Sequence, residues 1–155
     1  MLHYTKYFIL TICAVFILGN IAYADTTLSV QSKSASPADT ITVPIVLESD
    51  SQLSALSTDL SFNPEKLKFE EANIGAAASN KKIVTNKMKP GKVRIGLISM
   101  DSTALNDGEL ITVTFSVDPE AKPGEVQIEQ EVSGSTPEGE EAEISGKAGT
   151  IDVNY

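Results

Sequence analysis

Residues 53–75 hold the pattern that most restricts how this chain can fold. Between Leu56 and Phe62, larger side chains at every second position alternate with small or polar ones. A period of two places the two sets on opposite faces of a β-strand. Asn63-Pro64 must end that strand, because proline has no N–H for a strand ladder and Asn-Pro favours a turn. We predict a bent pair of strands whose core face resumes at Leu67 and Phe69.

Similar alternation recurs along the rest of the chain, separated by turn signals. Pro44 falls inside one of these runs, which places that strand at a sheet edge or at a bulge. Residues 83–88 allow only a weak strand, and residues 134–143 are interpreted as a solvated loop or a poor strand. Residues 76–80 are interpreted as a loop, with a short helical turn at residues 76–78 as the alternative. The clear strands are expected from Thr26 to Ser32, Thr40 to Leu47, Lys92 to Met100, Leu110 to Val117, Val126 to Val132 and Gly149 to Val153.

No segment has the periodicity of a convincing amphipathic helix. Eight or nine short strands, with a turn about every ten residues, are typical of an all-β protein built as a two-sheet sandwich or jelly roll. The residues after position 24 suffice for one core without disulfide bonds, and neither a repeat nor a linker divides them. We predict a single β-sandwich domain over residues 25–155.

The first 24 residues have the organisation of a secretory signal peptide. Lys6 supplies a basic start, the run from Phe8 to Leu18 is apolar, and Ala22-Tyr23-Ala24 is a small-x-small cleavage site. We predict cleavage before Asp25 and a secreted protein, extracellular or periplasmic, with no membrane attachment after cleavage. The alternative is an uncleaved N-terminal anchor.

Cleavage would remove Cys13 and His3, the only cysteine and the only histidine of the chain. Without them there is no Ser-His-Asp or Cys-His nucleophile and no thiolate or histidine zinc ligand. The net charge would become −10, from 11 basic and 21 acidic residues. That acidity argues against nucleic acid and anionic membranes as partners. No cofactor is predicted.

Carboxylates are the remaining groups that could support chemistry. Paired acids can hydrolyse glycosides, but the neighbours Glu70-Glu71 and Glu140-Glu141 would point to opposite faces in a strand and act as solubilising charge in a loop. Asp101, Asp107 and Glu109 could ligate calcium, yet Asp-Gly at a turn is usually conformational. We interpret the protein as a non-enzyme without a metal site of its own.

Four stretches, in a consistent order, carry a family resemblance. Ser36–Ile45 is a turn with proline and aspartate that leads into a Thr-Val-Pro-Ile strand, and Leu60–Phe69 contains an aromatic-Asn-Pro corner. Gly91–Leu97 and Asp107–Val117 are alternating strands, the second preceded by Asp-Gly. Together these stretches resemble the cohesin domain, the module that binds dockerins in cellulosome scaffolds.

The resemblance implies a nine-stranded jelly roll that recognises another protein through one exposed sheet face. It also implies that any calcium belongs to the dockerin. Carried onto this sequence, the face would draw on the bent strand and on the strand from Lys92, and Ser99 would join only if a bulge shifts the alternation. The predicted partner-binding residues are Ala55, Ser57, Asp59, Ser61, Arg94, Gly96 and Ser99.

The function predicted from the sequence is therefore a secreted, non-catalytic module that binds a dockerin-bearing or other extracellular protein. The alternative is a polysaccharide-binding sandwich, which rests on fold-level analogy alone. Sugars usually stack on exposed aromatic rings, whereas Phe62, Phe69 and Phe115 all fall on the core side of their predicted strands.

Overall fold

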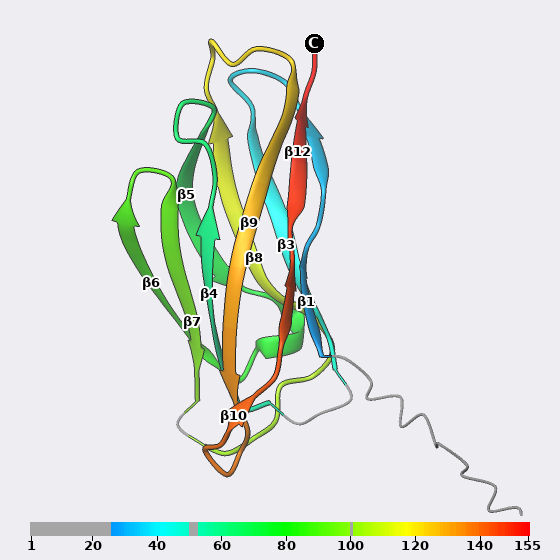
Figure 1. Cartoon of the computed structure of the whole chain (residues 1–155), viewed down its shortest axis with the longest axis vertical. Helices are drawn as coiled ribbons and strands as arrows, with labels where there is room; N and C mark the ends of the chain where they lie inside the picture. The colour runs from blue at the N-terminus through cyan, green and yellow to red at the C-terminus, as the bar shows by residue number, and fades with distance from the viewer. Residues whose placement is uncertain (1–25, 50–52, 100) are drawn as a thin grey trace, which may run out of the picture.

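The computed structural model describes residues 26–49, 53–99 and 101–155, which form two stacked β-sheets (Figure 1). The predicted signal peptide, residues 1–24, and Asp25 lie outside the described residues. One sheet has the strand order β11-β1-β3-β8-β5, and the other has the order β2-β12-β9-β4-β7-β6, with β10 paired to β9. The elements are β1 (Thr27–Val30), β2 (Lys33–Ala35), β3 (Thr40–Glu48), β4 (Ala55–Ser61), β5 (Leu67–Ile74), η1 (Ala76–Ala78), β6 (Lys82–Lys89), β7 (Lys92–Ile98), β8 (Gly108–Val117), β9 (Gly124–Ser135), β10 (Glu141–Ala142), β11 (Ser145–Lys147) and β12 (Gly149–Val153).

The all-β jelly-roll sandwich is confirmed, with twelve strands in the described residues where nine were expected. Three of the twelve, β2, β10 and β11, are only two or three residues long. β2 and β11 pair in parallel with β12 and β1, and β10 pairs with the end of β9. Segments this short carry no readable alternation, so the sequence pattern does not mark them.

Pro44 lies inside a sheet, so of the two expected positions, a sheet edge or a bulge, the edge does not apply. β3 runs between β1 and β8. The carbonyl oxygen of Pro44 accepts the Gln31 N–H at 3.0 Å, just beyond the end of β1. In an antiparallel strand the N and the C=O of one residue point to the same neighbour, so the missing N–H of Pro44 faces the end of β1. The hydrogen bonds between β3 and β8 therefore do not need it. The expected bulge is confirmed, since the register with β8 shifts between Ile45 and Val46.

Three segments are more regular than their sequence patterns predict. β6 is a full strand of eight residues at the edge of its sheet, and every residue except Ile83 is exposed, so no alternation marks it. Residues 76–78 form the short 3-10 helix η1, which is the helical turn that the sequence allowed as the alternative to a loop. Gly134 and Ser135 belong to β9, so the strand, rather than the loop, is the alternative that applies at this point.

The core lies between the sheets, with Phe115 fully buried near the bend that follows β4. The ring of Phe62 meets that of Phe115 edge-on with centroids 5.1 Å apart, and Phe69 does so at 6.2 Å. Phe69 is buried, but Phe62 is half-buried and packs against the core from its margin. The corner therefore closes one end of the sandwich with three aromatic rings.

Thr58 is the one polar residue on the core face of β4, and it is fully buried. Its hydroxyl donates to Oε1 of Gln130 at 3.0 Å. The Gln130 amide donates in turn to the carbonyl oxygens of Leu28 and Lys147. This chain of hydrogen bonds satisfies the buried hydroxyl and links β4 and β9 of one sheet to β1 and β11 of the other.

Candidate functional site

The outer face of the sheet that contains β4 carries six of the seven residues predicted to bind a partner. On β4, the residues at positions 55, 57, 59 and 61 are half-exposed and alternate with buried ones. On β7, Arg94 is exposed and Gly96 is half-exposed, again between buried neighbours. The two strands are paired, so these residues form one continuous surface, which we call the outer face.

Strand register arranges the outer face in rows that cross four strands. The small-residue row consists of Val84, Gly96, Ser57 and Ser133, from β6, β7, β4 and β9 in that order. The adjacent charged row consists of Asn86, Arg94, Asp59 and Glu131, from the same strands. Directly opposed residues in antiparallel strands have side chains close enough to interact, so each row acts as a unit.

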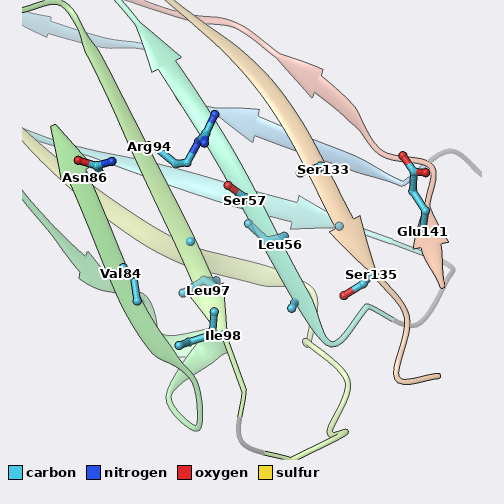
Figure 2. A pocket seen from close by; sticks show the side chains of 13 residues that line it. Leu56, Ser57, Val84, Asn86, Arg94, Leu97, Ile98, Ser133, Ser135 and Glu141 are labelled. Carbon is cyan, nitrogen blue, oxygen red and sulfur yellow. The ribbon is translucent and has the colours of Figure 1, made fainter. Parts of the chain in front are cut away.

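The small-residue row lines an open depression of about 690 Å³ (Figure 2). Val84 and Ile98 border it as exposed apolar side chains, with 52% and 45% of their surface accessible. At Gly96 the space above the strand is free, because an added Cβ would meet nothing closer than the Val84 carbonyl oxygen at 4.0 Å. The lining residues are Ala55, Leu56, Ser57, Val84, Asn86, Arg94, Gly96, Leu97, Ile98, Ser133, Gly134, Ser135 and Glu141.

Arg94 and Asp59 form a two-pronged ion pair in the charged row. Nε of Arg94 donates to Oδ1 of Asp59 and Nη2 donates to Oδ2, both at 2.7 Å. The side chain of Asp59 is 12% exposed and that of Arg94 is 53% exposed. The hydrogen bond from Arg94 lowers the pKa of Asp59, and the same bond raises the pKa of Arg94. The pair therefore holds a planar donor group in a defined position beside the depression.

The two sides of the outer face carry opposite charge. β9 presents Glu125, Glu129 and Glu131 at exposed positions, and Asp152 of β12 pairs with Glu125. By contrast, β6 and β7 present Lys82 and Arg94 on the outer face, in the rows of Ile98 and Asp59. A partner that covers the face therefore meets positive charge on one side and negative charge on the other.

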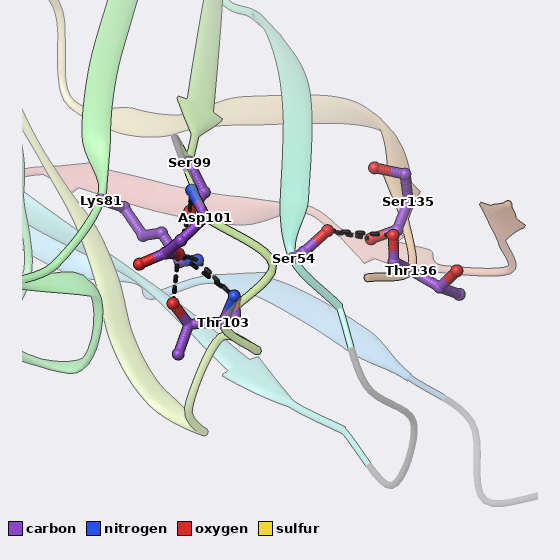
Figure 3. Close-up of polar contacts among 7 residues, drawn as sticks. All are labelled: Ser54, Lys81, Ser99, Asp101, Thr103, Ser135 and Thr136. Atoms are coloured by element: carbon purple, nitrogen blue, oxygen red, sulfur yellow. Dashed lines mark hydrogen bonds and ion pairs between the residues drawn. The ribbon is translucent and has the colours of Figure 1, made fainter. Parts of the chain in front are cut away.

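Ser99 is the predicted residue that the structure does not bring onto the outer face. β7 ends at Ile98, its pairing with β6 has no bulge at that end, and Ile98 takes the outward position. The Ser99 hydroxyl instead donates to the Asp101 carboxylate at 2.5 Å, in the loop that follows (Figure 3). The condition under which Ser99 would join the face is thus not met.

Several residues of the outer face were missed by sequence reasoning, for different reasons. Ile98 continues the alternation two residues beyond Gly96, so the pattern itself could have identified it. Val84 and Asn86 lie on an edge strand whose two faces are both exposed, which leaves no pattern to follow. Glu131 and Ser133 reach the face through their register with β4, which is a long-range relationship.

Two of the three acidic residues considered as calcium ligands, Asp101 and Asp107, accept hydrogen bonds from different segments. The Asp101 carboxylate accepts hydrogen bonds from Ser99 and Thr103, while Oδ1 of Asp107 accepts the Ser49 N–H at 3.0 Å. Across residues 26–49, 53–99 and 101–155, no three Asp, Glu, His or Cys side chains gather in a way that could hold a metal ion. No helix among these residues is long and apolar enough to cross a membrane.

The fold is similar to those of several solved cohesins at low sequence identity. The cohesin of the Coh-OlpA–Doc918 type I cohesin–dockerin complex from Clostridium thermocellum has a TM-score of 0.76 and 17% identity, and the match covers 84% of this chain and 99% of that chain. The non-cellulosomal cohesin of the archaeon Archaeoglobus fulgidus gives 0.74 and 20%, covering 85% and 93%. CaCohA2 from Clostridium acetobutylicum gives 0.74 and 20%, covering 84% and 91%.

The sequence comparison identifies the family directly. No curated protein matches the sequence of the whole chain. The family model of the cohesin domain matches residues 26–153, which is nearly the full extent of the described sandwich. The chain belongs to the cohesin domain family.

Proposed function

We propose that this chain is a secreted, non-catalytic cohesin module that binds a dockerin-type protein through its outer face. The observation that carries the proposal is the depression over Gly96, which leaves room for a side chain of a partner at the centre of an exposed sheet face. Solved relatives of similar fold, including Coh-OlpA, are in complex with dockerins. The predicted signal peptide in residues 1–24 supports an extracellular location.

The residues of the outer face suit protein recognition. Val84 and Ile98 supply exposed apolar surface, and the small-residue row lets another backbone approach closely. Arg94 and Glu131 add charged groups at the border. A small apolar centre with a polar rim is typical of protein–protein interfaces.

The lining of the depression does not favour catalysis or sugar binding. Arg94 and Glu141 are its only charged side chains among the described residues, which provides no pair of carboxylates for acid–base work. The lining also contains no aromatic ring on which a sugar could stack. These features support a binding role for a protein rather than for a polysaccharide.

Calorimetric titration with purified, calcium-loaded dockerins from the same organism tests the proposal. Gly96→Arg fills the depression without meeting the protein's own atoms near the Cβ position, so we expect binding to weaken at least about tenfold. Thr42→Arg is the matched control, because Thr42 is exposed on the other sheet. The control should bind within about twofold of the unaltered protein.

Three outcomes would contradict the proposal. They are the absence of any calcium-dependent partner among the dockerins, equal weakening by Gly96→Arg and Thr42→Arg, and depletion of the protein by insoluble cellulose or chitin in place of dockerin binding. Secretion has its own readout, since the N-terminal sequence of protein recovered from outside the cytoplasm should begin at Asp25.

A further inference from the structure

A second hollow lies at the opposite end of β4 from the depression and does not involve the small-residue row. It has a volume of about 500 Å³ and is bounded by the corner after β4, the start of β5 and the β6–β7 turn. These segments gather at one end of the sandwich (upper left in Figure 1), where the Phe62 N–H donates to the Gly91 carbonyl oxygen at 2.9 Å. We call this hollow the corner slot.

The corner slot has an apolar interior. Phe62, Leu67, Phe69 and Val93 line it together with two proline rings. Leu67 and Val93 belong to the buried core, whereas Phe62 is half-buried and therefore presents part of its ring to the slot. A concave apolar site of this size is large enough for one bulky side chain and its neighbours.

The rim of the corner slot is positively charged. Four lysines contribute to the lining: Lys68, Lys87, Lys89 and Lys92. The ammonium group of Lys87 lies 5.5 Å from the centroid of the Phe69 ring, which places a cation directly over the apolar interior. The chain as a whole has a net charge of −9, so four lysines around one hollow make this region unusually basic for the protein.

Carboxylates offset this positive charge only in part. Asp118 is the single acidic residue of the lining, and its Oδ1 already accepts the Glu120 N–H at 2.8 Å. Lys68 is paired with Glu70 at 3.6 Å on the exposed outer side of β5. Among the described residues, neither Lys87 nor Lys89 forms a salt bridge, although the charge of Lys87 contributes to lowering the pKa of Glu70.

The neighbouring strand edge indicates what kind of ligand fits. β6 is the last strand of its sheet, and among the described strands it pairs only with β7. Its outer edge therefore carries backbone N–H and C=O groups that can pair with an extended chain. Lysines on an edge discourage pairing with neutral or basic strands, but they attract an acidic one.

We propose that the corner slot binds an extended acidic peptide segment, which lies along the edge of β6 and inserts one apolar side chain between Phe62 and Phe69. The carboxylates of the peptide on either side of that side chain contact Lys87 and Lys89. This binding is independent of the outer face, so the module has two recognition sites at different ends of β4.

Fluorescence anisotropy with a labelled pentapeptide, a central phenylalanine flanked on each side by two acidic residues, tests this inference at low and at physiological salt. We expect saturable binding that weakens as salt rises, because rim charges are exposed to screening. A peptide with glycine at the centre should bind at least about fivefold more weakly, since it has no side chain for the slot. The same affinity for both peptides would show non-specific attraction and overturn the inference.

Charge reversal locates the site on the protein. Lys87→Glu/Lys89→Glu should weaken peptide binding at least about tenfold. Lys33→Glu is the matched control, because Lys33 is an exposed lysine of β2 at the opposite edge of the same sheet. Equal weakening by both variants, or saturation by an oligogalacturonate with no binding of the peptide, would overturn the inference.

Further measurements show whether a loss of peptide binding comes from the corner slot or from unfolding of the variant. Thermal unfolding should show that Lys87→Glu/Lys89→Glu remains folded, and amide chemical shifts on peptide addition should move at Phe62, Phe69 and Gly91. Shifts confined to other residues would overturn the proposed location. Dockerin affinity should not change in the double variant, so failure of one proposal leaves the other testable.

Discussion

The ammonium group of Lys81 lies 3.6 Å from the Asp101 carboxylate, joining a side chain with no exposed surface to one that is 64% exposed. Lys81 also donates to the carbonyl oxygen of Thr103 (Figure 3). Ser99 and Thr103 donate to the same carboxylate. The loop that follows β7 is thereby held beside Ile98, at the border of the depression.

Protonation of Asp101 should release this loop. Hydrogen bonds from Ser99 and then from Thr103 lower the pKa of Asp101 strongly. A carboxylate whose folded pKa lies below its unfolded value of about 3.9 stabilises the protein above that value, and the contribution disappears as pH falls toward the folded pKa. Asp101→Asn should therefore be less stable than the unaltered protein at pH 7, and the difference should shrink below about pH 4. Urea unfolding at several pH values measures it.

The hydroxyl of Thr103 allows a direct test of whether hydrogen bonds lower the pKa of Asp101. Thr103→Val keeps the shape of the side chain and removes one donor to Asp101, so the pKa of Asp101 should rise toward its ordinary value. A carboxyl titration followed by NMR measures the pKa in both proteins. An unchanged titration curve would show that the hydroxyl does not stabilise the carboxylate.

The ion pair between Asp59 and Arg94 should orient side chains more than it stabilises the fold. Asp59→Asn is expected to lower the free energy of unfolding by less than about 1 kcal/mol, because solvent screens a pair at the surface. In the Arg94→Gln background, the same change at Asp59 should cost less. Chemical denaturation of all four proteins measures the coupling, and equal costs in both backgrounds would mean that the two side chains do not cooperate.

Removal of the Phe115 ring should lower the free energy of unfolding far more than the change at Asp59 does. Phe115 is fully buried between two edge-on rings, so Phe115→Ala should cost about 3–5 kcal/mol of unfolding free energy. Phe62→Ala should cost less, because that ring is half-buried. Urea midpoints at constant slope measure both changes, and the reverse order would mean that Phe62 is the main support of the corner.

Two glycines of the same hairpin should respond in opposite ways to alanine. Gly91 has a φ of +81°, and an added Cβ would lie 2.5 Å from the Phe62 carbonyl oxygen, so Gly91→Ala should cost at least about 1–2 kcal/mol. Gly96 has open space and no such constraint. Gly96→Ala should be neutral or stabilise by up to about 1 kcal/mol. Thermal unfolding compares them directly, and equal melting temperatures would contradict the geometry.

Alternation along the chain predicts which way the side chains of the clear strands point. Six of the seven predicted partner-binding residues lie on the outer face for this reason, since alternation along a strand follows from local backbone geometry. The corner at Asn63-Pro64 was predictable on equally local grounds, because proline stops a strand wherever its N–H would be needed. Ile98 follows from the same alternation, whereas Ser99 was included only on condition of a bulge, which this end of β7 does not have.

Which strands are neighbours is a property of the folded sandwich that no local pattern predicts. The sandwich placed Val84 beside Gly96 and Ser133 beside Ser57, and so made the depression from residues up to 76 positions apart along the chain. It also put Pro44 inside a sheet, where a short β1 leaves the missing N–H without consequence. The physical reason is that strand pairing depends on how two whole sheets bury their apolar faces against each other, whereas side-chain direction depends only on the residue's own peptide geometry.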